Sequence, residues 1–595
     1  MILESLILLI FLSFVWINYR PKNYPPGPLK VPVLGNILNL SKLDKDGLGK
    51  LFFKMSKTYG KVFSFDLGSY RAVIVNDYKL IKEAWNNPLL CGRPQFIGLN
   101  LRTGGIRRGI LFHDGDEWSE QRRFALRQLK EFGFGKRSME SLVMDEVNEL
   151  IQGLRKDAGK SISTRNRFNA AVLNALWTIT TGDRFQHDDP ELMELVLNIQ
   201  KGLSGTGGKN PALFMPWLLK LAPSLTGWAT LRDIISVTYD YLCPYTDKLM
   251  ADYEGGSPQH FSHVFIDEIK KTTNERSSFF GERGQKTLTA VLMDLFQAGA
   301  ETTSTTLTWL FLYMSVFPEH QKKLQEEIDE VLESKQPTLQ DRYRMPYTEA
   351  IILETLRLSS MVPLGLFHCA MEDVHWRSYF IPKNTIIIAN LYSAHYNPDN
   401  WVKPEIFNPE RFLNEEKTGI AKQPEGFVAF STGKRVCLGE TLARDELFLF
   451  TTAIFQQFDV TWDPDLPKPS LEKQLGAIIA PQNYNYQFTN IPIYVKEITN
   501  IVDELRVEEN GGERENAGKS RNELQATEII RKKALEEERN RMKRKFNQIV
   551  NGFPQSWGTH VIPQVSKVPL ELYIRYNGIS SPQTTRHLAI SQWST

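Results

Sequence analysis

Cysteine is scarce in this sequence, and so is any imbalance of charge. The 595 residues contain four cysteines, Cys91, Cys243, Cys369 and Cys437, too few and too scattered for a disulfide framework or a structural zinc site. Such usage is typical of a protein that faces a reducing compartment. Lysine and arginine number 71 against 69 aspartate and glutamate residues, so the net charge of +2 excludes a general attraction to nucleic acid.

Long apolar runs are also rare, and the main one is at the N-terminus. Residues 2–17 are almost wholly apolar, just long enough to span a bilayer, which takes at least about 17 residues. No small-residue cleavage site follows, and Arg20 and Lys22 come directly after the run. These features favour a retained anchor with the rest of the chain on the cytoplasmic side. We therefore predict a membrane anchor over residues 1–20, not a cleaved signal peptide.

The rest of the chain divides by composition. A proline-rich hinge over residues 21–47 contains Pro-Pro-Gly-Pro, which cannot continue a helix. Residues 48–497 show long helical periodicities and short β-rich runs, which predict one mostly helical domain with small β-sheets. A polar linker over residues 498–530 and an extension of unknown role over residues 531–595 follow.

Particular segments carry these patterns. The predicted helices are Met139–Leu154, Leu288–Phe317, Glu319–Leu332, Thr348–Leu358 and Glu440–Phe455, with an exposed, densely charged helix at Arg531–Ile549. The predicted strands are Val62–Leu67, Arg71–Val75 and Thr385–Asn390.

The clearest chemical signal lies in residues 430–439, Phe-Ser-Thr-Gly-Lys-Arg-Val-Cys-Leu-Gly, directly before a predicted helix. A cysteine at a helix N-terminus faces unpaired amides and the positive end of the helix dipole, and both favour the thiolate that ligates metals. Gly433 and Gly439 allow backbone and a flat cofactor to approach the Cys437 sulfur. Arg435 can pair with a carboxylate of that cofactor. The pattern predicts an activated cysteine beside a planar, anionic group, and haem fits that description.

This segment resembles the cysteine-ligand signature Phe-x-x-Gly-x-Arg-x-Cys-x-Gly of the cytochrome P-450 superfamily. Four further motifs resemble those of the family, in its expected order: Trp118-x-x-x-Arg122, Ala-Gly-Ala-Glu-Thr-Thr over residues 298–303, Glu354-x-x-Arg357 and Pro-Glu-Arg-Phe over residues 409–412. The resemblance covers about residues 20–497, and the anchor and proline hinge are similar to those of microsomal members. It implies the family fold, with haem b (iron protoporphyrin IX) between a distal helix and the cysteine loop, and with iron held by Cys437.

The resemblance also assigns roles to other residues. Thr302 can bond back to the carbonyl four residues earlier and open its helix locally, and with Glu301 it would form the acid–alcohol relay that delivers protons. Glu354, Arg357 and Arg411 would form a structural triad. The implied partners of the haem propionates are Trp118, Arg122, Arg435 and His368, with Arg93 a weaker candidate.

Electrons have to come from another protein, because no convincing dinucleotide fingerprint follows a predicted strand. The resemblance implies a flavin-containing NADPH–cytochrome reductase, with a cytochrome b-type donor as a second possibility, at the endoplasmic reticulum membrane. Residues available for docking on a basic proximal face are Lys434, Arg435, Arg444, Arg127 and Lys130.

The substrate expected for a deep, mostly apolar haem pocket is a small lipophilic molecule. Pocket walls are predicted from the segments that flank the distal motif and the Glu-Arg helix: Phe296, Ala300, Val362, Leu364 and Leu366. Residues 121–127 and 132–135 resemble arthropod microsomal enzymes of the clan that handles hormones and xenobiotics, among them methyl farnesoate epoxidases. Hydroxylation or epoxidation of a terpenoid or steroid hormone precursor is therefore one hypothesis. A haem-binding sensor or carrier, and a haem-thiolate isomerase that needs no external electrons, are the alternatives.

Overall fold

The computed structural model describes Leu12, Asn18 and residues 20–42, 47–134, 137–163, 166–206, 211–422 and 424–491. Most of the predicted anchor, the linker, the charged helix Arg531–Ile549 and the C-terminal extension lie outside these residues. Within the described residues, none of the helices combines the length and the apolar character that crossing a membrane requires.

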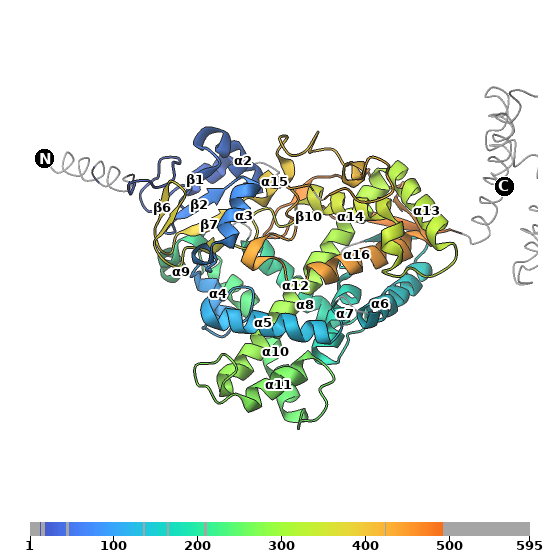
Figure 1. The fold of residues 1–595 in the computed structure, drawn as a ribbon, viewed down its shortest axis with the longest axis horizontal. Coiled ribbons are helices and arrows are strands. Elements are labelled where there is room, and N and C mark those ends of the chain that lie inside the picture. Colours follow the sequence, from blue (N-terminus) through green and yellow to red (C-terminus); the bar gives the residue numbers. More distant parts are fainter. Residues whose placement is uncertain are drawn as a thin grey trace, which may run out of the picture. The chain divides into compact units, whose positions relative to one another are not determined.

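Helices dominate the described chain (Figure 1). The α-helices are α2 (Gly47–Tyr59), α3 (Tyr78–Asn86), α4 (Ile97–Leu101), α5 (Gly115–Glu131), α6 (Arg137–Lys156), α7 (Asn169–Thr181), α8 (Pro190–Thr206), α9 (Pro216–Leu221), α10 (Trp228–Asp252), α11 (Phe261–Lys271), α12 (Gly281–Val316), α13 (Pro318–Leu332), α14 (Pro346–Ser359), α15 (Leu391–Tyr396) and α16 (Glu440–Phe455). Short 3-10 helices are η1 (Ile37–Lys42), η2 (Pro88–Leu90), η3 (Pro211–Phe214), η4 (Asp341–Arg344), η5 (Pro409–Phe412) and η6 (Gly433–Arg435).

The largest sheet of the described residues has the order β1-β2-β7-β4, formed by β1 (Val62–Ser64), β2 (Ala72–Val75), β7 (Ile386–Ala389) and β4 (His368–Cys369). Its β2 and β7 strands run parallel, with Ile74 opposite Ile388, and both strands are buried, as expected for a parallel pair. The smaller sheets contain β3 (Ile162–Ser163), β11 (Asn485–Asn490) and β8 (Phe458–Trp462); β9 (Lys473–Gln474) and β10 (Ala480–Pro481); and β5 (Val374–Trp376) and β6 (Tyr379–Ile381). The predicted class, mostly helical with small sheets, is confirmed.

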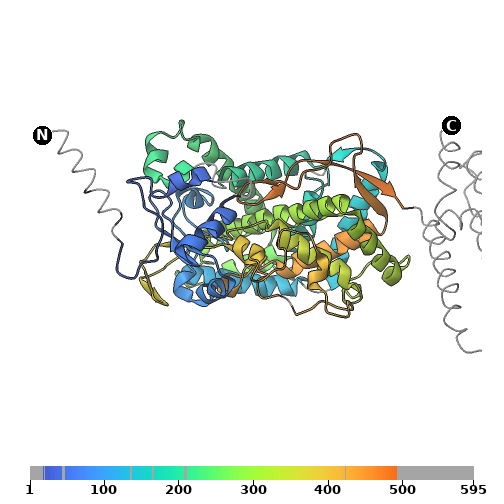
Figure 2. The ribbon, with the colours of Figure 1, turned by 90° about the horizontal axis from the view of Figure 1, so that it is seen from above.

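Helix α12 passes through the middle of the helical domain and packs against α7, α10, α14 and α16 (Figures 1 and 2). Nearly all of its residues from Thr287 onward are buried, apart from a short stretch around Gly299. The sequence predicted a start at Leu288, but the helix begins at Gly281. Its first turns carry exposed Glu282, Arg283 and Lys286, so they lack the apolar periodicity on which the prediction relied.

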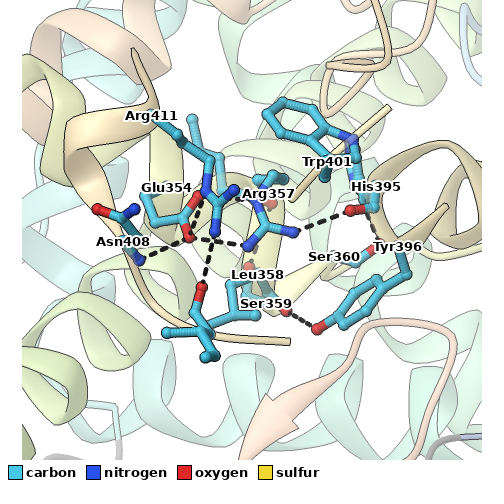
Figure 3. Close-up of polar contacts among 12 residues, drawn as sticks. Glu354, Arg357, Leu358, Ser359, Ser360, His395, Tyr396, Trp401, Asn408 and Arg411 are labelled. Atoms are coloured by element: carbon cyan, nitrogen blue, oxygen red, sulfur yellow. Dashed lines mark hydrogen bonds and ion pairs between the residues drawn. The ribbon is translucent and has the colours of Figure 1, made fainter. Parts of the chain in front are cut away.

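A buried ion network joins α14 to η5 (Figure 3). The guanidinium of Arg357 donates to both carboxylate oxygens of Glu354, at 2.7 and 2.8 Å, and neither side chain has any exposed surface. Arg411 donates to Glu354 at 3.3 Å, and the amide of Asn408 donates to it at 2.9 Å. Arg357 also donates to the carbonyl of His395 at 2.8 Å, which ties the network to α15. The predicted triad of Glu354, Arg357 and Arg411 therefore exists.

Candidate active site

Cys437 lies on a tight loop between η6 and α16. Its amide donates to the Phe430 carbonyl at 3.0 Å and closes the loop. Gly433 has φ +71°, and a Cβ there would collide with the carbonyl group of Trp85 on α3, so only glycine allows this approach. At Gly439 a Cβ would meet no atom within 4 Å, so there is open space beside the cysteine. Cys437 itself is exposed, so the loop leaves this residue accessible to a ligand.

The electrostatics of Cys437 differ in part from expectation. The amides of Gly439 and Glu440, together with the Arg122 cation, lower the pKa of the thiol as predicted, but burial outweighs them and raises it overall. The cysteine nevertheless keeps accessible surface, as expected for an atom deep in the protein that borders an internal space. The helix N-terminus therefore favours the thiolate, as predicted, while burial is the larger effect and acts against the charged form. A bound metal cation would supply the missing stabilisation.

Basic side chains gather beside this loop. The guanidinium of Arg435 is buried and lies 3.5 Å from the centre of the Trp118 ring, and it donates to the carbonyls of Cys91 (3.1 Å) and His113 (2.9 Å). Burial, followed by repulsion from the neighbouring Arg93, lowers the pKa of Arg435 to about 8. Burial likewise lowers the pKa of Arg93 to about 10. Two buried cations side by side are costly unless an anion joins them.

Two further predicted propionate partners, His368 on β4 and Arg122 on α5, lie near the same loop. His368 is buried on β4 and stacks on Trp85 with ring centroids 3.8 Å apart. Burial and the cations of Arg93 and Arg435 hold its pKa well below the ordinary value, so its ring is neutral. Arg122 on α5 donates to the carbonyl of Val436 at 2.6 Å, next to Cys437.

Several polar atoms of this group are buried and have no hydrogen-bond partner among the described residues. They are Trp118 Nε1, Arg435 Nη1, His368 Nδ1 and His113 Nδ1. A buried polar group without a partner costs about 1–3 kcal/mol, so their concentration at one place calls for a ligand. A planar group that carries carboxylates on one edge and a metal for Cys437 fits these residues. Of the predicted propionate partners, Trp118, Arg435 and His368 offer such atoms. Arg122 instead donates to the loop backbone and lies 5.9 Å from the centre of the Trp118 ring.

The distal motif lies on α12. The hydroxyl of Thr302 donates to the carbonyl of Ala298 at 2.7 Å, which is the predicted back-bond. Glu301 points to another side: its carboxylate accepts from Gln200 at 3.0 Å and from Asn169 at 3.4 Å. Thr305, one turn later on α12, also donates to the Glu301 carboxylate at 3.3 Å.

A polar cavity opens beside Glu301. Amide and hydroxyl side chains line much of it, namely Asn166, Asn169, Gln200, Ser304, Thr305, Thr308, Gln474, Gln482 and Asn483. Nothing in the sequence marked Asn169 and Gln200 as neighbours of Glu301, because they lie on different helices far away in the chain.

Two of the predicted pocket walls are wrong. Phe296 has no exposed surface and packs edge-to-face against Trp177, with centroids 5.3 Å apart. Ala300 is 1% exposed and its carbonyl accepts from Asn169, so it also faces α7. Both residues lie on the side of α12 away from Ala298 and Thr302, since neighbouring helix positions are turned by about 100°. Leu364 belongs to a core cluster, and Val362 and Leu366 keep exposed surface.

Of the proposed docking cations, Lys434, Arg127 and Lys130 are exposed. Arg435 is buried among the unpartnered donors, so its assignment to a docking surface is wrong. Arg444 is half-buried and donates to Glu349 at 2.6 Å.

A mostly helical domain with an exposed cysteine on a tight loop, beside buried polar atoms suited to carboxylates, fits the class of haem-thiolate proteins. The family model described as Cytochrome P450 matches residues 25–488, and this chain belongs to the cytochrome P450 family. Members of this family are oxidoreductases of the monooxygenase type that contain haem with a cysteine thiolate ligand.

Curated relatives agree with this assignment. The chain is 34% identical to "Farnesoate epoxidase" of Bombyx mori over 493 residues, which cover 81% of this chain and 98% of the relative. It is 34% identical to "Cytochrome P450 2J5" of Mus musculus (81% and 94% covered) and 35% identical to "Cytochrome P450 2J2" of Homo sapiens (78% and 91% covered). The farnesoate epoxidase and the two mammalian cytochromes P450 are thus similar to this chain to nearly the same degree.

Proposed function

We propose that this chain is a haem-dependent monooxygenase that inserts one oxygen atom into a small lipophilic substrate by hydroxylation or epoxidation. The observation that supports it most is the group of unpartnered polar atoms, Trp118 Nε1, Arg435 Nη1 and His368 Nδ1, beside the loop of Cys437. Cys437 would hold the iron, and Trp118, Arg435 and His368 would donate to the propionates. Arg122 would brace the loop through the Val436 carbonyl and lie near the thiolate as a compensating cation.

Bound haem supplies the reductive activation of dioxygen, in which one oxygen atom enters the substrate and the other leaves as water. The chain itself contributes the protons. The carboxylate of Glu301 borders the polar cavity and takes up a proton from solvent there. The hydroxyl of Thr302, which donates to the Ala298 carbonyl at rest, would rotate to pass on its proton on the neighbouring face of α12 and would regain one from Glu301 through an intervening water molecule. Asn169 and Gln200 donate to the Glu301 carboxylate and hold its orientation while it takes up and releases the proton.

The electron donor in this proposal is an NADPH–cytochrome reductase, with a cytochrome b-type protein as a further donor. The exposed cations Lys434, Arg127 and Lys130 would attract an acidic partner to the side of the cysteine loop. Lys434 is three residues before Cys437, on the loop that the Cys437 amide closes by donating to the Phe430 carbonyl.

The location in this proposal is the endoplasmic reticulum membrane, with the catalytic domain on the cytoplasmic side. Buried residues of η1 and α9 pack in the same core cluster. Exposed large apolar side chains next to these two elements support this location. They are Leu29, Val33, Leu38, Trp217, Leu221 and Leu225. Concentrated apolar exposure of this kind suits insertion into a lipid interface.

The substrate in this proposal is a terpenoid or steroid hormone precursor such as methyl farnesoate. The likeness to farnesoate epoxidase of Bombyx mori, over nearly all of that relative, supports a terpenoid. Few side chains face the substrate, and at 34% identity most of them can differ between this chain and the epoxidase. The substrates of the two enzymes can therefore differ as well.

Purified enzyme with reductase and NADPH is expected to convert methyl farnesoate to an epoxide, with an ecdysteroid and a model xenobiotic tested in parallel. Product formation is measured by mass spectrometry, with omission of reductase as the control. Turnover of only the ecdysteroid or the xenobiotic would contradict the terpenoid assignment. Product that forms without reductase would favour an isomerase, and haem-loaded protein without any turnover would favour a sensor or carrier.

A further inference from the structure

His113 lies on the loop before α5, and none of the sequence motifs assigns it a role. Its carbonyl accepts from Arg435 Nη2 at 2.9 Å. The guanidinium of Arg435 in turn lies 3.5 Å from the centre of the Trp118 ring. His113 therefore belongs to the same connected group as two residues that would donate to the haem propionates.

Contacts of the neighbouring residues fix the backbone on which His113 lies. The carboxylate of Asp114, the next residue, accepts from the Arg93 amide at 2.7 Å and forms an ion pair with Arg107 at 3.4 Å. Arg107 also donates to the carbonyl of Arg93 at 3.1 Å. Together with the hydrogen bond from Arg435, these contacts hold the loop in one position. A side chain on such a loop binds a ligand with little further loss of conformational entropy.

The two ring nitrogens of His113 have different surroundings. Nε2 lies 3.1 Å from the carboxylate of Glu117 in the first turn of α5, and the His113 side chain is 17% exposed. An ionised carboxylate only accepts hydrogen bonds, so Nε2 carries a proton in this contact. Nδ1, in contrast, is buried and has no hydrogen-bond partner among the described residues. It shares this property with Trp118 Nε1 and Arg435 Nη1, the neighbouring atoms that are suited to a carboxylate.

From this placement we infer that His113 is a further cofactor-binding residue, whose Nδ1 donates to a carboxylate of the bound haem. This role rests on the proposed function, since it concerns the same cofactor. With Nε2 bonded to Glu117, Nδ1 can donate as well only when the ring is an imidazolium. The cation would then lie between two carboxylates, that of Glu117 and that of the cofactor, and would make a charge-assisted hydrogen bond to each.

The charges around His113 support donation in the haem-loaded form. Arg93 and Arg435 are buried, and an imidazolium at His113 would add a third positive charge beside them. Apart from the ion pair within the loop, the negative charge in contact with this ring among the described residues is the carboxylate of Glu117. Haem brings two propionates, so binding would make the positive and negative charges equal in number. Buried cations are costly without such counter-charges.

The role of His113 is tested on haem-loaded, full-length enzyme by the rate at which haem is lost to excess apomyoglobin. His113→Phe keeps a ring but has no donor, and it is expected to lose haem about tenfold faster or more, because a charge-assisted hydrogen bond is absent. His113→Asn retains an N–H donor close to the position of Nδ1, so its rate should stay within about threefold of wild type.

A second readout separates a lost hydrogen bond from general damage to the loop. The propionate bending band in the resonance Raman spectrum of the ferric enzyme depends on the hydrogen bonds that the propionates accept. This band is expected to shift in His113→Phe and to return toward its wild-type position in His113→Asn.

A matched control is His375→Phe, which removes an exposed histidine from β5 and should leave both the rate and the band as in wild type. A wild-type rate in His113→Phe would overturn the inference, as would faster haem loss with an unchanged band, or an equal loss in His113→Asn. If His113→Phe does not fold, His113→Ala replaces it with the same expectations. Wild-type protein that binds no haem would instead overturn the proposed function, so the two failures are distinguishable.

Discussion

Replacement of Arg357 with methionine is expected to destabilise the folded domain by about 3–5 kcal/mol, because it leaves the fully buried carboxylate of Glu354 without its main partner. Domains of this kind are stable by only about 5–15 kcal/mol. The variant should therefore lose much of its folded population at 37 °C, and its haem with it. Thermal unfolding followed by circular dichroism, together with the haem-to-protein ratio, measures both effects.

The matched control for this variant is Arg377→Met, which removes an ion pair with Glu83 at the surface, where the two side chains are 53% and 40% exposed. An exposed pair contributes about 0–1 kcal/mol, so the control should unfold close to the wild-type temperature. Equal unfolding temperatures for the two variants would show that the network of Glu354 does not support the fold as argued.

Replacement of Thr302 with alanine is expected to reduce product formation by about 100-fold or more, since a positioned proton donor contributes about 10²–10⁴-fold. Consumption of NADPH should fall much less, because electron delivery does not use this hydroxyl. The ratio of product to NADPH consumed is the informative measurement. Thr306→Ala is the control, because Thr306 makes the same kind of bond one turn later, to the Thr302 carbonyl at 2.9 Å. An equal loss in Thr306→Ala would point to damage of α12 instead of lost proton donation.

Much of the fold was predictable where the sequence has strong periodicity. The helix Glu440–Phe455 was predicted with its observed bounds, and the strand of residues 72–75 was predicted to within one residue. The start of α12 was missed, because its first turns are exposed and polar. The anchor over residues 1–20 and the extension over residues 531–595 remain predictions, since these segments fall largely outside the described residues.

Sequence motifs suggested which residues form the candidate site, but they did not predict how those residues are arranged in space. Local rules gave the Thr302 back-bond, whereas the direction of the Glu301 carboxylate depends on α7 and α8, which no local pattern connects to it. Phe296 and Ala300 lie on the buried side of α12, so their prediction as pocket walls was wrong. The sequence did not predict how this helix is oriented.

The central claim, a haem held by the thiolate of Cys437, is tested most directly by the carbon monoxide difference spectrum of the reduced protein, with wild type compared with Cys437→Ser. The account predicts a strongly red-shifted Soret band in the wild type and its loss in the variant, because sulfur ligation is what alters the electronic structure of the iron. A band at the position typical of histidine-ligated haem, or wild-type protein that contains no haem, would contradict it.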